Sequence, residues 1–323
     1  MSTIENFVKN KNRRKILFTP GPSSLSKENI LGLGPFFGRG DSDYLSVEKK
    51  VLNKLKKMSG QKRVVPLQGA GSLAIEIMCY NFLKGKILII DTGYYSERVK
   101  KICYNLLNLK RIKILKSISW KKIDEFSGKF DWIICCPTET SIGLKIPIKD
   151  VKKLSRKLKA KIMLDSTASF GLENHHNFAD VLSFSSCKGL FGLTGACFIS
   201  YKTKPLYFKN SFYLNLANHE NKKMTGPYHI IASLHNILKN YSKFKKSVIQ
   251  NKKVFSKKFE KFLVHPKKNQ PLICTYVNKK IKSSSRKVIL YKSRGKIMGS
   301  VVSHLGEAHL KSKAKGKILR YLK

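Results

Sequence analysis

The sequence predicts an α/β protein whose main domain is built on a mostly parallel sheet. From about residue 45 onward, helical and strand patterns alternate along the chain, which is the order that produces parallel strand pairing. Short apolar runs bounded by glycine or polar residues indicate buried strands, and longer segments with helical spacing of apolar residues indicate helices. The chain has 323 residues, 42% of them hydrophobic, which suffices for one large domain with a smaller one.

The predicted elements of the large domain follow one another in a regular order. Helices are expected at 46–58, with Ser46 as the cap, and at 73–83, 97–109, 149–158 and 228–238. Strands are expected at 63–67, 86–90, 112–115, 132–136, 161–164, 181–184 and 196–201. The lysine-rich segment 239–261 predicts a long solvated helix, and the rest alternates short strand and helix patterns. We therefore predict an arm at 1–14, a large domain at 15–238 and a small C-terminal α+β domain at 239–323.

The chain is strongly basic, with 65 Lys and Arg against 19 Asp and Glu and a net charge of +46. Such a charge first suggests a nucleic-acid partner. However, the lysines are spread over nearly every segment, and we find no zinc-finger spacing, no aromatic strand of the RNP type and no clear helix-turn-helix pattern. Charge alone supplies only non-specific affinity for polyanions, so we expect no specific nucleic-acid partner.

The sequence also predicts a cytoplasmic protein without a metal site. No apolar run reaches the length of a membrane span, and residues 1–14 are polar and lack the apolar stretch of a signal peptide. Seven cysteines, odd in number and scattered, show no C-x-x-C spacing. Reduced, buried thiols therefore explain them better than disulfides or zinc ligands.

Four segments place unusual residue types at the ends of predicted strands, where open α/β sheets bind their ligands. The first is the glycine turn at 69–72 before a helix, where small residues and the helix N-terminus suit an anion. A tight turn also needs glycine for steric reasons alone. The second is Asp165, which closes the strand at 161–164. A carboxylate there needs a cation such as a protonated pyridine nitrogen, or it caps a helix.

The other two segments are the lysine loop and a tyrosine pair. Lys188 follows an apolar strand within a Ser/Gly loop, unlike the many lysines whose context indicates a solvated charge. A neutral amine in that position can form an imine and then move protons. Tyr94 and Tyr95 follow the strand at 86–90, and either can stack on a planar cofactor or be an ordinary loop aromatic.

Five motifs match one enzyme family in order and spacing. They are T-P-G-P at 19–22, Q-G-A-G-S at 68–72, E-T-S-I-G at 139–143 with P-I at 147–148, D-S-T-A-S-F-G at 165–171, and S-S-C-K at 185–188. Together they resemble the class V, fold-type I pyridoxal-phosphate-dependent aminotransferases, over residues 17–201 and more loosely to Tyr228. The strongest resemblance is to the 2-aminoethylphosphonate–pyruvate transaminases, followed by the alanine–glyoxylate (serine–pyruvate) aminotransferases.

This resemblance implies a role for each matching position. Lys188 would hold pyridoxal 5'-phosphate as a Schiff base, Asp165 would meet the pyridine nitrogen and Tyr95 would stack on the ring. The cofactor's phosphate and phenolic oxygens would contact a further set of residues: Ala70, Gly71, Ser72 and Thr140. Thr225 resembles a threonine that reaches the phosphate of the neighbouring subunit's cofactor, which implies a homodimer.

The C-terminal part departs from the family. Its R-I-G-x-x-G-E motif reads V-V-S-H-L-G-E at 301–307, so Val301 replaces the arginine that clamps the substrate carboxylate, and the small domain is short. A bidentate guanidinium is hard to replace. The candidate substrate residues are Arg39, Arg294 and His304, with Thr19 and Gly21 of the first motif.

The function implied by the resemblance is transfer of an amino group. The donor would be 2-aminoethylphosphonate, alanine or serine, and the acceptor a small oxo acid such as pyruvate or glyoxylate. Two alternatives stay open at this point. One is another pyridoxal-phosphate reaction on the same fold, such as a lyase or a desulfurase, and the other is a non-catalytic homologue that binds polyanions.

Overall fold

The computed structural model describes residues 3–12, 15–34, 38, 40–305 and 319–323. Its centre is a seven-stranded sheet with the strand order β2-β10-β9-β8-β5-β3-β4. Strands β9, β8, β5, β3 and β4 pair in parallel, and β10 is antiparallel to both of its neighbours. The predicted mostly parallel sheet is therefore confirmed. The strands are β2 (Arg63–Gln68), β3 (Gly85–Asp91), β4 (Ile112–Ser119), β5 (Trp132–Cys135), β8 (Lys161–Asp165), β9 (Val181–Ser185) and β10 (Ala196–Tyr201).

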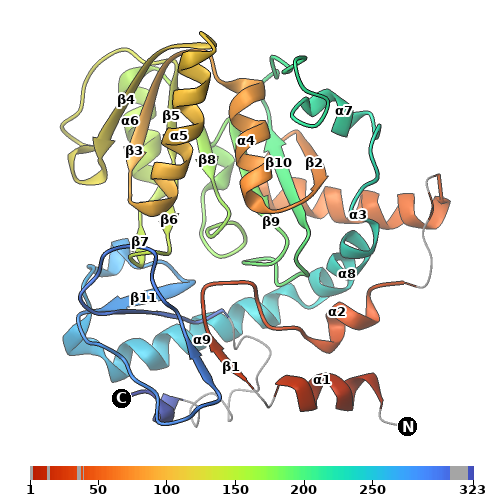
Figure 1. Cartoon of the computed structure of the whole chain (residues 1–323), viewed down its shortest axis with the longest axis vertical. Helices are drawn as coiled ribbons and strands as arrows, with labels where there is room; N and C mark the ends of the chain where they lie inside the picture. Colours follow the sequence, from red (N-terminus) through yellow and green to blue (C-terminus); the bar gives the residue numbers. More distant parts are fainter. Residues whose placement is uncertain (1–2, 13–14, 35–37, 39, 306–318) are drawn as a thin grey trace.

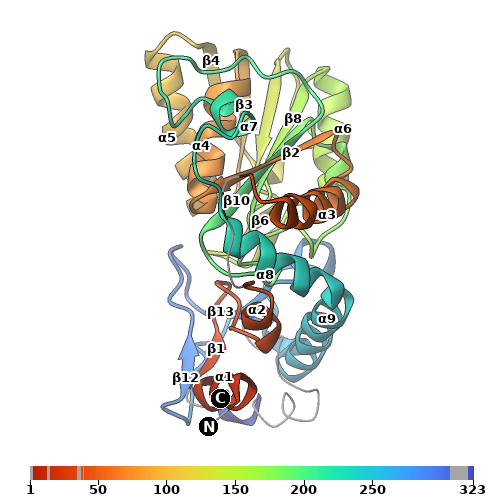
Figure 2. The same ribbon diagram turned by 90° about the vertical axis from the view of Figure 1, so that its right-hand side faces the viewer.

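Helices cover both faces of this sheet (Figures 1 and 2). One face carries α4 (Gly71–Phe82), α5 (Tyr94–Asn108) and the short α7 (Leu216–Glu220), and the other carries α3 (Ser42–Ser59), α6 (Ile148–Leu158) and α8 (Tyr228–Lys239). Strand side chains alternate between the two resulting cores: Ile87 and Ile89 pack with α4 and α5, whereas Leu88 and Ile90 pack with α3 and α6. This double burial explains why the strands read as continuous apolar runs in the sequence.

The structure corrects two details of the predicted helices. Ser46 is not the cap of its helix, because Asp41 accepts hydrogen bonds from the N–H groups of Asp43 and Tyr44 and α3 begins at Ser42. The lysine-rich segment forms α9 (Tyr241–Lys258), but this helix is not simply solvated. It buries three apolar residues spaced for one helix face: Phe244, Val248 and Phe255.

The C-terminal segments form two small sheets below the large one in Figure 1. Strands β11 (Cys274–Val277) and β13 (Ser300–Ser303) pair antiparallel, and β12 (Val288–Leu290) pairs in parallel with β1 (Ile16–Phe18). Beside them lie α1 (Ile4–Asn12) and α2 (Lys27–Leu31). Beyond residue 264 the described residues contain only short 3-10 turns instead of the predicted helices. The domain boundaries after residues 14 and 238 stay predictions.

Short elements complete the chain. A two-stranded ribbon, β6 (Thr138–Glu139) and β7 (Leu144–Lys145), follows β5. The 3-10 turns are Trp120–Lys122, His176–Phe178, Glu260–Phe262, Lys267–Asn269 and Leu319–Tyr321.

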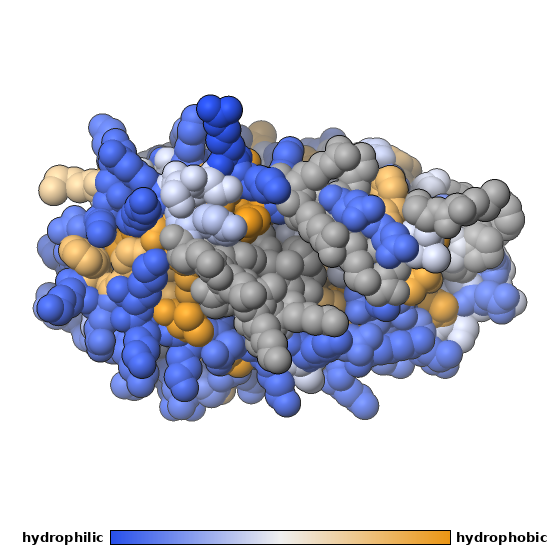
Figure 3. Space-filling model, turned by 90° about the horizontal axis from the view of Figure 1, so that it is seen from below, coloured by the Kyte–Doolittle hydropathy of each residue, from blue (hydrophilic) through white to orange (hydrophobic). Residues whose placement is uncertain are grey.

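The cysteines are buried as predicted, with one exception. All seven cysteines are free, six are buried, and Cys187 is half-buried. No helix among the described residues is both long and apolar enough to cross a membrane, and no cluster of three potential metal ligands occurs in the same residues. Seen from below, the surface is mostly hydrophilic and its exposed apolar areas are small (Figure 3).

Candidate active site

A cavity of about 430 Å³ opens at the carboxyl edge of the large sheet. It is built from the segments that follow β2, β3, β5, β8 and β9, together with one turn of the C-terminal region. Eight residues predicted from the sequence therefore meet in one place, although they come from six separate segments. They are Ala70, Gly71, Ser72, Tyr95, Thr140, Asp165, Lys188 and Arg294.

The glycine turn leads from β2 directly into α4, whose N-terminus lines the cavity. Ala70 is the N-cap residue and supplies no side-chain hydrogen bond, so the first N–H groups of the helix are left for a ligand. Gly71 packs closely against the next loop, because a Cβ atom there would lie 3.0 Å from the Thr167 methyl carbon. This turn has the form of an anion site at a helix N-terminus.

Asp165 is buried at the end of β8, and its two carboxylate oxygens have different surroundings. Oδ1 accepts hydrogen bonds from the Thr167 N–H at 3.0 Å and from the Thr167 hydroxyl at 2.6 Å. Among the described residues, the one partner of Oδ2 is the Cys136 thiol, with Sγ at 3.9 Å. Burial raises the pKa of Asp165, while the Thr167 hydrogen bonds and the charges of Lys188 and Arg98 lower it. The carboxylate bonds within its own turn and caps no helix among the described residues, so Oδ2 is suited to a cationic ligand.

Lys188 projects into the same cavity from the loop after β9. Its Nζ atom lies 5.7 Å from the centre of the Tyr95 ring. Gly21 packs against the stem of this lysine, since a Cβ atom at Gly21 would lie 3.1 Å from Lys188 Cγ and 3.2 Å from Cε. Gly21 thus leaves room for the lysine, whereas Thr19 is half-buried beyond the end of β1 and does not line the cavity.

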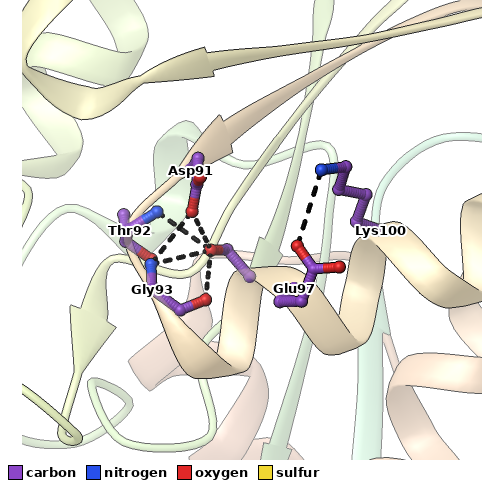
Figure 4. A network of polar contacts seen from close by, with 6 residues as sticks. Asp91, Thr92, Gly93, Glu97 and Lys100 are labelled. Carbon is purple, nitrogen blue, oxygen red and sulfur yellow. Dashed lines mark hydrogen bonds and ion pairs between the residues drawn. The ribbon is translucent and has the colours of Figure 1, made fainter. Parts of the chain in front are cut away.

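The turn that carries Tyr95 is held by a polar network at the start of α5 (Figure 4). The Ser96 hydroxyl accepts hydrogen bonds from the N–H groups of Thr92 and Gly93, each at 2.9 Å, and donates to Asp91 at 2.8 Å. On the outer side of the helix, Glu97 and Lys100 form an ion pair at 3.5 Å. These bonds fix the first turn of α5 and, with it, the position of the tyrosine ring.

Glu139 is a buried carboxylate that ties this turn to the loop after β6. Its Oε2 atom accepts from the Tyr95 N–H at 2.8 Å, and Oε1 accepts from the Ser141 N–H at 3.0 Å and the Ser141 hydroxyl at 2.5 Å. Burial raises the pKa of Glu139, and these hydrogen bonds oppose that shift. The E-T-S-I-G motif contained this residue, but the sequence did not indicate which helix it would hold.

Two buried hydroxyls at the cavity have no hydrogen-bond partner among the described residues. They are Oγ1 of Thr138 and Oγ1 of Thr140, and both residues line the cavity. Buried polar atoms are nearly always hydrogen-bonded, so two hydroxyls without a partner at a cavity indicate a polar ligand. The cavity therefore offers an anion-binding helix end, a carboxylate with a free oxygen, two unpaired hydroxyls and an amine, and this set fits pyridoxal phosphate.

Other predicted residues lie elsewhere. Thr225 is exposed and lines a different cavity of about 330 Å³, together with Tyr44 and Glu48. His304 is buried and shares a hydrogen bond of 2.8 Å with the Thr275 hydroxyl, so it does not replace the missing arginine. Arg39 and positions 306–307 lie outside the described residues.

The structure adds Arg98 to the cavity, a residue that the sequence analysis had not singled out. Its guanidinium carbon lies 5.3 Å from the centre of the Tyr95 ring and 5.9 Å from that of Tyr94. The available signal was its position on the predicted helix, three and four residues after the tyrosine pair, because residues at that spacing share a helix face.

Comparison with known proteins agrees with a cavity that fits pyridoxal phosphate. No family model matches the chain. The 2-aminoethylphosphonate–pyruvate transaminase of Pseudomonas aeruginosa is 26% identical over 266 residues, which cover 75% of this chain and 70% of that protein. Among solved structures, an aspartate aminotransferase of subgroup IV from Thermus thermophilus superposes with a TM-score of 0.77 at 16% identity, over 94% of this chain and 99% of that one. An alanine–glyoxylate aminotransferase from Nostoc gives 0.76 at 16% identity, over 95% of each chain.

These comparisons give the fold of the chain and the enzymes that its sequence resembles. Its fold is that of the fold-type I, pyridoxal-phosphate-dependent aminotransferases. Within that class, its sequence is similar to the 2-aminoethylphosphonate–pyruvate transaminases. The predicted fold and the predicted resemblance are both confirmed.

Proposed function

We propose that this chain is a pyridoxal-phosphate-dependent aminotransferase that moves an amino group between a small amino donor and a small oxo acid. The donor class is 2-aminoethylphosphonate, alanine or serine, and the acceptor class is pyruvate or glyoxylate. The observation that carries the proposal is the convergence of Lys188, Asp165 and the N-terminus of α4 on one cavity. Residues from three strand ends line that cavity, and they supply an anion site, a carboxylate and an amine for a phosphate, a protonated ring nitrogen and an aldehyde carbon.

Each residue has a defined task in this proposal. The backbone N–H groups of Ala70 and Gly71 and the Ser72 hydroxyl would hold the phosphate, and Tyr95 would stack on the ring. Oδ2 of Asp165 would face the protonated ring nitrogen, while the two Thr167 hydrogen bonds oppose the rise in the pKa of this carboxyl that burial causes. Thr140 offers its unpaired hydroxyl to the phenolic oxygen.

Lys188 carries the reaction itself. When bound, pyridoxal phosphate supplies an electron sink for the negative charge that develops on the substrate carbon. Lys188 would hold this cofactor through its amine. As a neutral amine, its Nζ atom would also move a proton at the substrate carbon. Gly21 leaves the lysine stem the space it needs for these positions.

We also propose a cytoplasmic homodimer as the active unit. Thr225 lines a cavity separate from that of Lys188, which leaves it available for a contact to the partner's cofactor. Seven free cysteines suit a reducing compartment. Analytical ultracentrifugation of the cofactor-loaded protein tests the assembly, and a monomer would contradict it.

The absorbance spectrum of the purified protein with added pyridoxal phosphate tests the central proposal. We expect the visible band of a lysine-bound cofactor in the natural protein, its absence in Lys188→Ala, and its retention in Lys153→Ala, which changes an exposed lysine of α6. Loss of the band on adding a donor, and its return on adding pyruvate or glyoxylate, would support transamination. A natural protein that takes up no cofactor would contradict the proposal and favour the polyanion-binding alternative. A band that donors convert without an oxo acid restoring it would favour a lyase.

A further inference from the structure

Glu139 is buried beside the Lys188 cavity, but it does not line that cavity. Its exposed fraction is 0%, and both of its carboxylate oxygens accept hydrogen bonds from neighbouring segments of the chain. The reaction proposed for Lys188 assigns no task to this carboxylate. Burying a carboxylate is costly unless several donors bind it, so its place in the wall calls for a physical reason.

One oxygen of Glu139 holds the turn that carries Tyr95. Oε2 accepts from the Tyr95 N–H at 2.8 Å. The backbone of this turn passes close to the glutamate stem, since Gly93 has a φ of +133° and a Cβ atom there would lie 3.3 Å from Glu139 Cγ. Such a positive φ favours glycine. The Tyr95 ring, whose centre lies 5.7 Å from Lys188 Nζ, is therefore held from behind by the buried carboxylate.

The other oxygen holds the loop after β6. Oε1 of Glu139 accepts from the Ser141 N–H at 3.0 Å and from the Ser141 hydroxyl at 2.5 Å. Thr140 lies between these two residues and lines the cavity, and its hydroxyl has no partner among the described residues. The ring of hydrogen bonds that closes around Thr140 restricts its backbone, so its hydroxyl is kept in one direction.

The same loop holds the C-terminal turn that carries Arg294. The Ser293 hydroxyl donates to the Ser141 carbonyl and accepts from the Gly295 N–H at 3.0 Å. This turn packs closely on the loop, because a Cβ atom at Gly295 would lie 2.9 Å from the Ile142 side chain. Arg294 follows Ser293 directly and lines the cavity. The hydrogen bonds of one buried carboxylate thus extend to both sides of the cavity.

We propose that Glu139 is a positioning residue that fixes the two sides of the cavity relative to each other, with the Tyr95 ring on one side and Arg294 on the other. This inference rests on the proposed aminotransferase function, because bound pyridoxal phosphate reports the position of Tyr95. A carboxylate accepts hydrogen bonds on both oxygens, whereas an amide accepts on one side and donates on the other. Glutamine could therefore satisfy the N–H of Tyr95 or that of Ser141 but not both, and methionine could satisfy neither.

Glu139→Met tests the Tyr95 side in the protein loaded with pyridoxal phosphate. We expect the Kd of the cofactor, measured by dilution, to rise about tenfold to a hundredfold, as for a lost hydrogen bond to a charged group. The visible circular dichroism per bound cofactor should also weaken, because Tyr95 no longer holds the ring in one orientation. A loss of stability alone would leave the signal per bound cofactor unchanged.

Hydrogen exchange of the loaded protein, followed by mass spectrometry, tests the Arg294 side. The Gly295 N–H bonds to the Ser293 hydroxyl, so its exchange reports whether the turn stays docked on the loop. In Glu139→Met we expect exchange in a peptide covering residues 291–297 to become about fivefold to tenfold faster. Ser293→Ala cuts this link alone, so it should speed exchange in the same peptide and leave the circular dichroism unchanged.

Glu139→Gln provides a second, milder variant of the same residue. One acceptor oxygen remains, so the cofactor signal or the exchange rate should change while the other stays close to that of the natural protein. This one-sided pattern distinguishes positioning from a general loss of stability. If Glu139→Met does not fold, Glu139→Gln still decides the question, because two unchanged measurements would overturn the inference.

Glu173→Met is the matched control. Glu173 is also a largely buried carboxylate, and it accepts from the Leu272 N–H at 2.6 Å and pairs with Lys145 at 3.4 Å. It ties the C-terminal segment to the turn after β8, but it does not line the Lys188 cavity. We expect this variant to melt at a lower temperature while the circular dichroism and the exchange of residues 291–297 stay as in the natural protein.

The outcomes separate the inference from the function on which it rests. If the natural protein takes up cofactor and transfers amino groups but Glu139→Met behaves as Glu173→Met does, the inference fails and the function stands. A change in only one measurement for Glu139→Met would also overturn it, because Glu139 would then hold one side alone. A natural protein that takes up no cofactor would contradict the proposed function, and the exchange measurement would still test the link from Glu139 to the Arg294 turn.

Discussion

The two walls of the cavity differ in how their charged groups are balanced. The wall formed by the sheet edge contains Asp165 and Glu139, whose oxygens accept hydrogen bonds from Thr167, Tyr95 and Ser141. The wall formed with the C-terminal segment contains Arg294, an exposed side chain that is held only on Tyr94. Both carboxylates of the first wall are hydrogen-bonded within the protein, whereas the second wall presents a charge without an ion-pair partner among the described residues.

This difference shows where the cofactor and the substrate are recognised. Groups with internal hydrogen bonds are preorganised, so they suit a resident cofactor that must always bind in the same position. A charge without an internal partner responds to the ligand that arrives, which suits selection between substrates. Variants of the two walls should therefore fail in different ways.

Asp165→Asn should have the largest effect, because it changes the carboxylate of the sheet-edge wall whose Oδ2 atom faces the cofactor site. An amide cannot hold a protonated ring nitrogen as a carboxylate does, so we expect turnover to fall by about 100- to 1000-fold, or about 3–4 kcal/mol. The cofactor-free protein should respond in the opposite direction. Since burial raises the pKa of Asp165, the ionised carboxyl costs folding free energy at neutral pH, and the variant should melt at an equal or higher temperature.

The sign of the pH effect provides a further check on Asp165. A raised folded pKa means that the cost of the ionised carboxyl is present at neutral pH and disappears as the pH falls, so the natural protein and the variant should converge in acid. Asp180→Asn is the matched control, since Asp180 accepts from the Ile162 N–H at 2.9 Å at the opposite edge of the same sheet. It should leave turnover nearly unchanged. A similar loss of turnover in both variants would contradict the role of Asp165.

Ser293→Ala should have a smaller effect, confined to the wall with the unbalanced charge. It removes the hydrogen bond to the Ser141 carbonyl that holds the Arg294 turn, worth about 1 kcal/mol. We expect the substrate KM to rise about fivefold while kcat and the cofactor spectrum stay nearly the same. Ser283→Ala is the control, because Ser283 makes the same local turn with Ser285 but no bond to the cavity loop. A fall in kcat with unchanged KM would show that the turn acts on the reaction instead.

The sequence predicted the sheet-edge wall well and the other wall poorly, for a physical reason. Lys188, Asp165 and the glycine turn each follow an apolar strand directly, and parallel strands bring their carboxyl ends to one edge. Local pattern and topology therefore suffice to bring these residues together. The same local patterns also located every strand of the large sheet to within a few residues.

Arg294 and Glu139 depend on contacts between distant segments. Ser293 meets Ser141 across 152 positions of the chain, and no periodic pattern encodes that pairing. The position of Asp41 as the cap of α3 was missed for a different reason. Ser46 is an equally good capping residue, and only the burial of Tyr44 in the core places the helix start earlier.

The smallest expected effect concerns stability in the C-terminal region. Burial lowers the pKa of His304 to about 3 from a usual 6.5, so the unfolded chain binds a proton that the folded chain does not. A lowered histidine pKa means that stability is full above about 6.5 and is lost as the pH falls. Between about pH 7.5 and about pH 6 this residue should cost about 0.8 kcal/mol of unfolding free energy.

His304→Gln should remove that share of the pH dependence, because glutamine can bond to Thr275 but does not titrate in this range. Thr275→Val should instead lower stability at every pH and keep the slope, since the buried histidine remains. Denaturant unfolding at several pH values measures both.

His176 is buried in the large domain and shares a hydrogen bond of 3.0 Å with the Ser169 hydroxyl, and burial lowers its pKa to about 3 as well. If only His176→Gln flattens the slope, the C-terminal region unfolds separately from the sheet; equal effects from both variants mean that the two walls of the cavity unfold as one unit.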